Sequence, residues 1–291
     1  MTALSIALAN MQSLKNLIVQ TSMSDAGAVS LSYALAKMCS LEYFQMVLFD
    51  DSSFGGAGFA SFSAVLPNVL SLISFHLYGA ISDVSATVLS TALAKMSLEN
   101  FGLISGRITD TGAVPLIAAL ANISSLKSLR LINNMSDAGA TFLSGALEKL
   151  LALESFCLYS NDIGDVGAAS LSSVLAKMSS LQSLGILGLR IGDTGAAALS
   201  VAIANMASLK SLIILGGNIS DDGAGFLKSS FVKMSLETLY LCGFEITDAA
   251  AKDMASSLEC FGSIGSSEDD FMDMISAMDE TFELSGLLSG T

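Results

Sequence analysis

The sequence predicts an α/β solenoid: a curved array of short repeats, with a concave parallel β-sheet and with α-helices on its convex side. Three observations predict this fold. A unit of about 28 residues recurs nine times within the first 260 residues. Each unit begins with alternating apolar residues, which is typical of a strand with one buried face. Each unit continues with apolar residues at helical spacing, which is typical of a helix that buries one side.

The repeat is marked by an aspartate that is followed two residues later by Gly-Ala. Clear copies carry this aspartate at Asp25, Asp110, Asp137, Asp165 and Asp193. Weaker or degenerate copies have at this position Asp83, Asp221, Asp248 and Gly56. Neighbouring anchors are 27 to 31 residues apart, so about nine units account for residues 1–261. Residues 262–291 form a separate segment after the array.

One unit illustrates the order of the elements. Residues 153–158 alternate between apolar and other side chains and are expected to form a strand. Leu171, Leu175 and Met178 then recur at i, i+4 and i+7, which places them on one face of a helix. Asp165 stands where the N-cap of this helix belongs. We therefore expect its carboxylate to accept hydrogen bonds from the first amides of that helix.

The spacing of the two kinds of element predicts the curvature. Parallel strands lie about 4.8 Å apart, whereas packed helices need about 8–10 Å. The array must therefore bend with its strands on the inside. Nine units that bend by about 20–25° each form about a half-circle, which is a horseshoe with the sheet on its concave face.

The pattern resembles the leucine-rich repeats of the ribonuclease-inhibitor type, which also occur in NOD-like immune receptors and in the Ran GTPase-activating protein. The motif L-x-x-L-x-L-x-x-N-x-I-x-D-x-G-A-x-x-L is nearly complete from Leu153 to Leu171. The resemblance covers about 260 residues and implies a leucine-rich repeat solenoid rather than an activity. Two departures stand out: few units keep the asparagine found at Asn161, and the second unit has an insertion at 49–54 and lacks its aspartate.

The residues between the strand leucines are expected to point into the concave face. The position after the last leucine is apolar or aromatic in eight of nine units, which read Gln20, Val47, Tyr78, Ile104, Ile132, Tyr159, Leu187, Leu215 and Cys242. We expect this column to be a solvent-facing apolar ribbon about 40 Å long, which indicates an interface. The alternative is that β-branched and aromatic residues simply suit parallel strands.

The candidate partner-binding residues come from this column and from the one before the last leucine. Tyrosine and arginine often dominate binding energies at interfaces. The nine candidates are Tyr78, Ile104, Arg130, Ile132, Tyr159, Leu187, Ile213, Leu215 and Tyr240.

The charge distribution separates the array from the C-terminal segment. The chain has a formal charge of −14, and residues 253–291 hold nine of its 27 acidic residues and none of its 13 basic ones. This acidity argues against nucleic acid as a partner. Within residues 262–291, Ser267 is a candidate N-cap of an amphipathic helix. Its apolar stripe consists of Phe271, Met274, Ile275, Met278 and Phe282.

Three roles are open for this acidic amphipathic segment. A cap on the last repeat is favoured, because an array exposes its terminal apolar layer unless something covers it. Docking on the concave ribbon or on a partner is the second role, and a disordered tail is the third. At the other end, residues 4–11 match the helix at 31–38, so the chain begins inside a repeat. We expect upstream repeats, or else another subunit, to cover that end.

Other features of the sequence limit the possible functions. The N-terminus lacks a signal peptide, and the uncharged stretch 52–82 contains glycines and Pro67 that argue against a membrane span. The four cysteines form no C-x-x-C pair and His76 is the single histidine, so we expect no metal site, no disulfide framework and an intracellular, by default cytoplasmic, location. A phosphate-binding loop is also absent from the sequence. We therefore predict no enzyme and no cofactor.

Three functions fit these features. The first is a non-catalytic scaffold that binds another protein on its concave face. The second is an obligate structural subunit of a larger assembly, which the sparse charge and the mean hydropathy of +0.65 favour and which would include membrane-associated assemblies. The third is a GTPase activator like the Ran activator, for which an arginine finger would have to come from Arg107, Arg130 or Arg190.

Overall fold

The computed structural model describes residues 2–49, 54–231 and 234–256. Its nine strands form a single parallel sheet in sequence order. The strands are β1 (Asn16–Thr21), β2 (Tyr43–Leu48), β3 (Ser74–Gly79), β4 (Asn100–Ile104), β5 (Ser128–Asn133), β6 (Ser155–Ser160), β7 (Ser183–Gly192), β8 (Ser211–Asn218) and β9 (Thr238–Cys242). The protein is therefore a leucine-rich repeat solenoid, as the repeat predicted.

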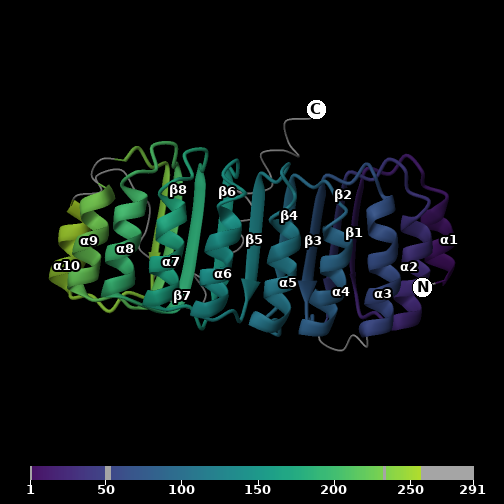
Figure 1. Cartoon of the computed structure of the whole chain (residues 1–291), viewed down its shortest axis with the longest axis horizontal. Coiled ribbons are helices and arrows are strands. Elements are labelled where there is room, and N and C mark those ends of the chain that lie inside the picture. The colour runs from purple at the N-terminus through teal and green to yellow at the C-terminus, as the bar shows by residue number, and fades with distance from the viewer. Residues whose placement is uncertain (1, 50–53, 232–233, 257–291) are drawn as a thin grey trace.

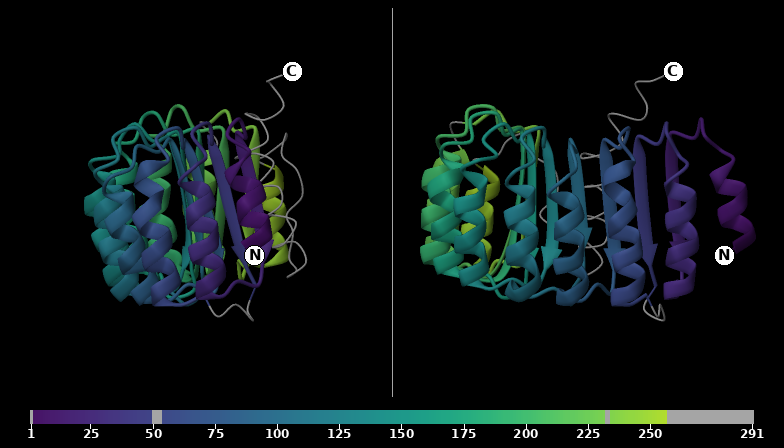
Figure 2. Two further views of the ribbon diagram at one scale, coloured as in Figure 1. Left: turned by 90° about the vertical axis from the view of Figure 1, so that its right-hand side faces the viewer. Right: turned by 45° about the vertical axis from the view of Figure 1, so that its right-hand side comes forward.

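A helix follows each strand and precedes the next one, and a further helix comes before β1. The helices are α1 (Thr2–Ala9), α2 (Asp25–Leu35), α3 (Gly56–Val65), α4 (Asp83–Leu93), α5 (Asp110–Leu120), α6 (Asp137–Leu147), α7 (Asp165–Leu175), α8 (Asp193–Ile203), α9 (Asp221–Phe231) and α10 (Asp248–Ser256). A 3₁₀ turn, η1 (Leu66–Asn68), extends α3. The helices form one row in front of the sheet (Figure 1), and this row lies on the outside of the curved array (Figure 2).

The core lies between the sheet and the helices. Every second strand residue points into it, as Leu129 and Leu131 do in β5, and both are buried. The expected helix face is confirmed, because Leu171, Leu175 and Met178 are completely buried. Helix α1 lies beside α2 in the place of a repeat helix, as the match between residues 4–11 and 31–38 predicted (Figure 1). Within the described ranges, no helix combines the length and the apolar character needed to cross a membrane.

The prediction that each repeat aspartate caps its own helix is wrong. The aspartate is the first residue of its helix, and its carboxylate instead reaches the helix of the next unit. Asp137 in α6 accepts hydrogen bonds from the amides of Gly164 (2.8 Å) and Gly167 (2.9 Å) at the start of α7. Asp165 binds the start of α8 in the same way through Gly192 and Gly195. The N-caps of α7 and α8 are glycines with no capping side chain of their own, so each helix start depends on the preceding unit.

This contact explains the motif glycine in units that follow an aspartate-bearing unit. A Cβ atom at Gly167 would lie 2.6 Å from the Asp137 carboxylate, and one at Gly195 would lie 2.7 Å from that of Asp165. The aspartate of one unit and the glycine of the next therefore act as a pair. This inter-unit pair, rather than a cap within one helix, is what the repeat preserves.

Two junctions lack the complete Asp–Gly pair, and their hydrogen bonds differ from those of the other junctions. The second unit has Gly56 instead of the aspartate, and the following unit has Ser85 instead of the glycine. Helix α4 is capped there by its own Ser82, whose hydroxyl accepts from the Ser85 amide at 3.3 Å. The last unit has Ala250 at the glycine position, and Asp221 bonds to the amide and the hydroxyl of Thr247, both at 2.8 Å, while the Ala250 amide donates to Thr247.

The motif asparagines also differ from the pattern implied by the resemblance. Asn161 is exposed and accepts a hydrogen bond from the Tyr159 hydroxyl at 2.6 Å. The buried polar residue is instead the one before it: Ser160 is fully buried and donates to the carbonyl of Met135 at 2.6 Å. Asn133 occupies the same place in the preceding unit and is buried as well. The second-unit insertion lies mostly outside the described residues, which include only Phe49 and the buried Phe54.

Candidate functional site

The strands present three columns of side chains to the concave face. The parallel register aligns them without a shift from β1 to β7, for instance with Arg130 beside Cys157 and Ile132 beside Tyr159. The first column is polar and reads Asn16, Tyr43, Ser74, Asn100, Ser128, Ser155, Ser183, Ser211 and Thr238. The middle column runs from Ile18 to Tyr240 and the last column from Gln20 to Cys242.

The structure brings the nine predicted site residues together on this face. The last column places Tyr78, Ile104, Ile132, Tyr159, Leu187 and Leu215 side by side in consecutive strands. The other three candidates belong to the middle column, which contains Arg130, Ile213 and Tyr240. Two adjacent rows therefore contain all nine candidates.

The expectation that this ribbon faces solvent along its whole length is wrong. Leu187 and Ile213 are each only 2% exposed, and Arg130 is 5% exposed. Leu187 and Ile213 belong to a second apolar cluster, separate from the core between the sheet and the helices, which also contains Cys157 and Leu215. Tyr159 and Tyr240 pack against its edge. Much of the predicted ribbon is thus withdrawn from water.

Four middle-column residues were not among the candidates and shape the face. Gly102 lies between His76 and Arg130, and a Cβ atom there would collide with the His76 ring. Gly185 lies beside Cys157, and its Cβ would approach the Cys157 sulfur to 3.1 Å. The two glycines leave room for the larger side chains next to them. The available signal was a glycine in the interior of a strand, which often marks close approach by another group.

Burial raises the pKa values of two side chains on β6, in the C-terminal half of the face. Desolvation raises the pKa of the Cys157 thiol to about 12, although the nearby Arg130 cation acts in the opposite direction. Burial also raises the pKa of the Tyr159 hydroxyl. Cys157 is therefore protonated at neutral pH and is not an activated nucleophile.

The N-terminal part of the face is aromatic and is exposed chiefly at β1, whereas His76 in β3 is buried. The ring of His76 lies 5.4 Å from that of Tyr43 and 6.2 Å from that of Tyr78, measured between ring centroids. The Tyr43 hydroxyl donates to the side-chain carbonyl of Gln45 at 2.5 Å. In β1, Ile18 is 56% exposed although it occupies the same column as the buried Ile213.

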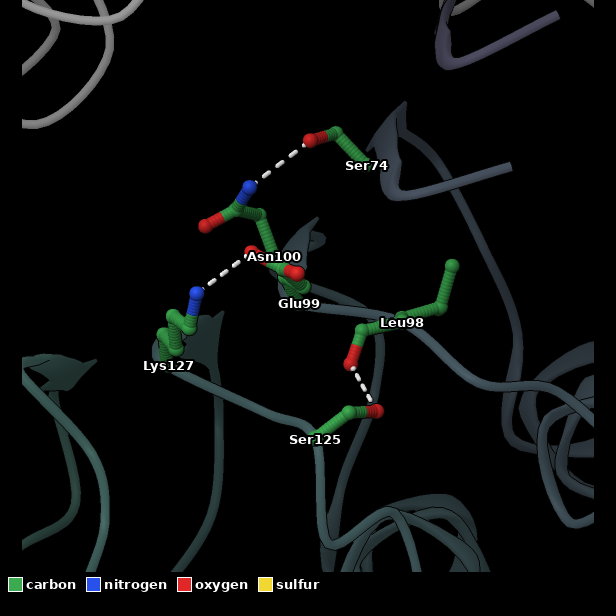
Figure 3. Close-up of polar contacts among 6 residues, drawn as sticks. All are labelled: Ser74, Leu98, Glu99, Asn100, Ser125 and Lys127. Carbon is green, nitrogen blue, oxygen red and sulfur yellow. Dashed lines mark hydrogen bonds and ion pairs between the residues drawn. The ribbon is translucent and has the colours of Figure 1, made fainter. Parts of the chain in front are cut away.

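A polar rim borders the face where the strands begin (Figure 3). Lys127 pairs with Glu99 of the preceding unit at 2.8 Å, which raises the pKa of the lysine, and Asn100 donates to the Ser74 hydroxyl at 2.8 Å. The same rim position carries the pairs Lys15–Glu42 and Lys210–Glu237. Such exposed pairs contribute little stability each. They keep the rim hydrated and so define the edge of the apolar face.

The described residues contain no group of three or more His, Cys, Asp or Glu side chains that could hold a metal ion. Of the described cysteines, Cys39 is exposed on a loop, whereas Cys157 in β6 is buried in the second apolar cluster and Cys242 in β9 packs against that cluster. Cys260 lies outside the described residues.

Comparisons with known proteins add little beyond the fold. No family model matches the sequence, and no curated protein matches it. A search of solved structures finds an internalin (inlF) from Listeria monocytogenes, with 21% identity, a TM-score of 0.45, and coverage of 80% of this chain and 69% of the internalin chain. It also finds the complex of Rad7 and Elc1 from yeast, with 16% identity, a TM-score of 0.41, and coverage of 88% of this chain and 80% of that chain.

Proposed function

We propose that this protein is a non-catalytic scaffold that binds another protein on its concave face. The observation that carries the proposal is the face itself: two adjacent rows of mainly apolar and aromatic side chains, continuous over nine strands and bordered by a hydrated rim. Of the last column, Val47, Tyr78, Ile104, Ile132 and Tyr159 remain partly exposed, and neighbouring exposed apolar side chains often mark an interface. The pattern of the repeats favours the ribonuclease-inhibitor type of leucine-rich repeat, and the scattered cysteines favour an intracellular location.

Three tyrosines are the expected anchors for the partner. Tyr78, Tyr159 and Tyr240 are partly exposed and stand three strands apart, on β3, β6 and β9. Each tyrosine can bury a large ring while its hydroxyl keeps a polar contact. A partner that spans them would lie across the strands, about 30 Å along the face.

Affinity capture from native extract with matched variants tests this proposal. Tyr78→Ala and Tyr240→Ala are expected to lose most of the proteins that the unmodified chain captures, because each removes an anchor from the concave face. The matched control is Tyr33→Ala, which removes an exposed tyrosine from the convex helix α2. Thermal melting establishes that all three variants are folded. Capture that survives both concave substitutions but is lost with Tyr33→Ala would contradict the proposal.

A second candidate function, an obligate subunit of a larger assembly, is favoured by the convex face. Val84, Val166 and Val201 are all about two-thirds exposed on α4, α7 and α8. Light scattering after size-exclusion chromatography separates the two functions, because a well-behaved monomer would argue against an obligate subunit. A GTPase activator would have to rely on the exposed Arg107, since Arg130 is buried and Arg190 is paired with Asp162 at 2.9 Å.

A further inference from the structure

Small buried residues lie between neighbouring helices on the convex side. The position seven residues after the repeat anchor faces the next helix, since the Ser144 hydroxyl in α6 donates to the Ser170 carbonyl in α7 at 2.6 Å. The distance between packed helices depends on the size of the side chains at their contact, and serine is small. In α1–α4 and α6–α8 the equivalent residues are the buried serines Ser5, Ser32, Ser63, Ser90, Ser144, Ser172 and Ser200.

Helix α5 has a larger residue at this position. The equivalent residue is Ile117, which is only 2% exposed and so does not turn out to water. Its branched side chain is larger than that of serine and keeps the two helix axes further apart. Helices α5 and α6 are indeed packed less closely than α4 with α5 or α6 with α7. Ile117 is therefore a spacer between α5 and α6.

A groove of about 400 Å³ opens on the convex side between these two helices (Figure 1). Its lining includes Ala118 and Ala121 on one side and Phe142, Gly145 and Ala146 on the other. A Cβ atom at Gly145 would meet no atom within 4 Å. The groove therefore leaves room for α5 and α6 to approach each other.

The same junction has fewer hydrogen bonds from the repeat aspartate. At most junctions this carboxylate binds two amides of the next unit, as that of Asp137 does. Asp110 accepts from the amide of Ser136 at 2.8 Å and from its hydroxyl, but the described residues include no bond to it from the Gly139 amide. The sheet is unaffected, because β5 and β6 pair along six consecutive residues without a shift.

We propose that the junction between α5 and α6 is a conformational joint, at which the angle between the two halves of the solenoid changes while the sheet stays paired. The axes of packed helices lie about 8–10 Å apart, so a change of about 2 Å is within the ordinary range. The helix and strand layers lie about 10 Å apart, so this change corresponds to a rotation of about 10°. Closing the groove straightens the array and widens the concave side.

The joint has a consequence for binding, which rests on the proposed function. The expected anchors Tyr78 on β3 and Tyr240 on β9 lie on opposite sides of the joint. Strand β9 is four strand spacings, about 19 Å, from β5, so a rotation of about 10° moves it by about 3 Å. The angle of the joint would therefore set the distance between these anchors.

Hydrogen exchange of the full-length chain, measured by mass spectrometry, tests whether this junction opens. The amides of α5 and α6 are expected to exchange at least tenfold faster than those of α7 and α8, because fewer contacts must break for the helices to separate. The amides of β5 and β6 are expected to be as protected as those of β7. Equal exchange in the four helices would overturn the proposal.

Filling the groove tests whether its empty space is the cause. Gly145→Leu places an apolar side chain in the groove and is expected to slow exchange in both α5 and α6 at least fivefold. Gly145→Ala is the matched control, because alanine has at least the helix propensity of leucine but leaves most of the groove empty. Slowing by alanine that equals the slowing by leucine would show that the groove does not control the opening.

Distances between two spin labels test the change of angle. Cys242→Ser and Cys260→Ser leave the exposed Cys39 for one label, beside the buried Cys157. A second label at Ser208→Cys makes a pair that crosses the joint, whereas one at Ser124→Cys makes a control pair that does not.

The pair that crosses the joint is expected to give the broader distance distribution, and Gly145→Leu is expected to narrow it without affecting the control pair. Equal widths for the two pairs, or a width that Gly145→Leu leaves unchanged, would contradict the joint. None of these measurements uses a binding partner. A failure of the joint is therefore distinguishable from a failure of the proposed scaffold function, which affinity capture tests.

Discussion

The N-terminal and C-terminal halves of the solenoid share one repeat but differ on the concave side and at their junctions. In the first half, Ile18 is exposed, and the junction between the second and third units lacks the Asp–Gly pair. In the second half, Ile213 at the equivalent position is buried, and the junctions from Asp110 to Gly223 are made by successive pairs. The core positions of the repeat define the backbone, whereas the concave positions are free to differ. Exposure of the middle column is therefore greatest at β1, where Ile18 is 56% exposed, whereas His76 in β3 and Ile213 in β8 are buried.

The largest expected difference comes from the two equivalent isoleucines. Ile213→Asp places a charge in the buried cluster and is expected to lower the free energy of unfolding by about 3 kcal/mol. Ile18→Asp, in the same column of β1, is expected to change it by less than about 1 kcal/mol. Urea unfolding followed by circular dichroism measures both. Equal losses in the two variants would show that the difference in exposure between Ile18 and Ile213 does not affect stability.

The glycines of the Asp–Gly pairs provide the next largest effect. Gly167→Ala forces a Cβ atom against the Asp137 carboxylate at 2.6 Å and is expected to cost about 2 kcal/mol. Gly145→Ala in α6 is the control, because a Cβ there meets no atom within 4 Å. It is expected to stabilise by about 0.5–1 kcal/mol through helix propensity. Urea midpoints that move in the same direction for both alanines would show that the junction contact is unimportant.

Building the missing pair into the second unit tests whether the junctions are interchangeable. Gly56→Asp supplies the carboxylate, and a Cβ atom at position 56 meets no atom within 4 Å. Ser85→Gly makes room for it at the start of α4. The double variant is expected to be more stable than the sum of the single changes by about 1 kcal/mol, because only the two changes together let the carboxylate accept from the amide of residue 85. A double-mutant cycle without coupling energy would contradict the pairing.

The smallest expected effect is a loss of stability at acidic pH. Hydrogen bonds from the Ser220 hydroxyl and from the amides of Ser220 and Gly223 hold the pKa of Asp193 below its ordinary value, against a smaller effect of burial. A lowered pKa contributes stability that is fully present above the unfolded-state value, about 3.9, and is lost as the pH falls through the folded-state value. Asp193→Asn is therefore expected to be less stable than the unmodified chain at pH 7. The difference should shrink towards pH 2, which acid titration of the melting temperature would detect.

The regular features of this protein could be predicted because they depend on residues close together in the chain. The alternation in 153–158 and the spacing of Leu171, Leu175 and Met178 were sufficient to place a strand and a helix in each unit. The two concave columns followed from the same alternation. The role of the repeat aspartate was missed because a carboxylate at the start of a helix is equally close to two candidate helix ends. The joint change to Gly56 and Ser85 was the available signal.

The sequence by itself determined the period, the order of the elements and the set of side chains on the inner face, because each of these follows from backbone geometry within one unit. Only the tertiary structure decided which helix each aspartate serves and which half of the inner face is withdrawn from water. Both depend on distances between units, where a carboxylate can reach the amides of Gly164 or a leucine can cover a cysteine. Those distances are set by how neighbouring repeats stack, and a one-dimensional pattern does not contain them.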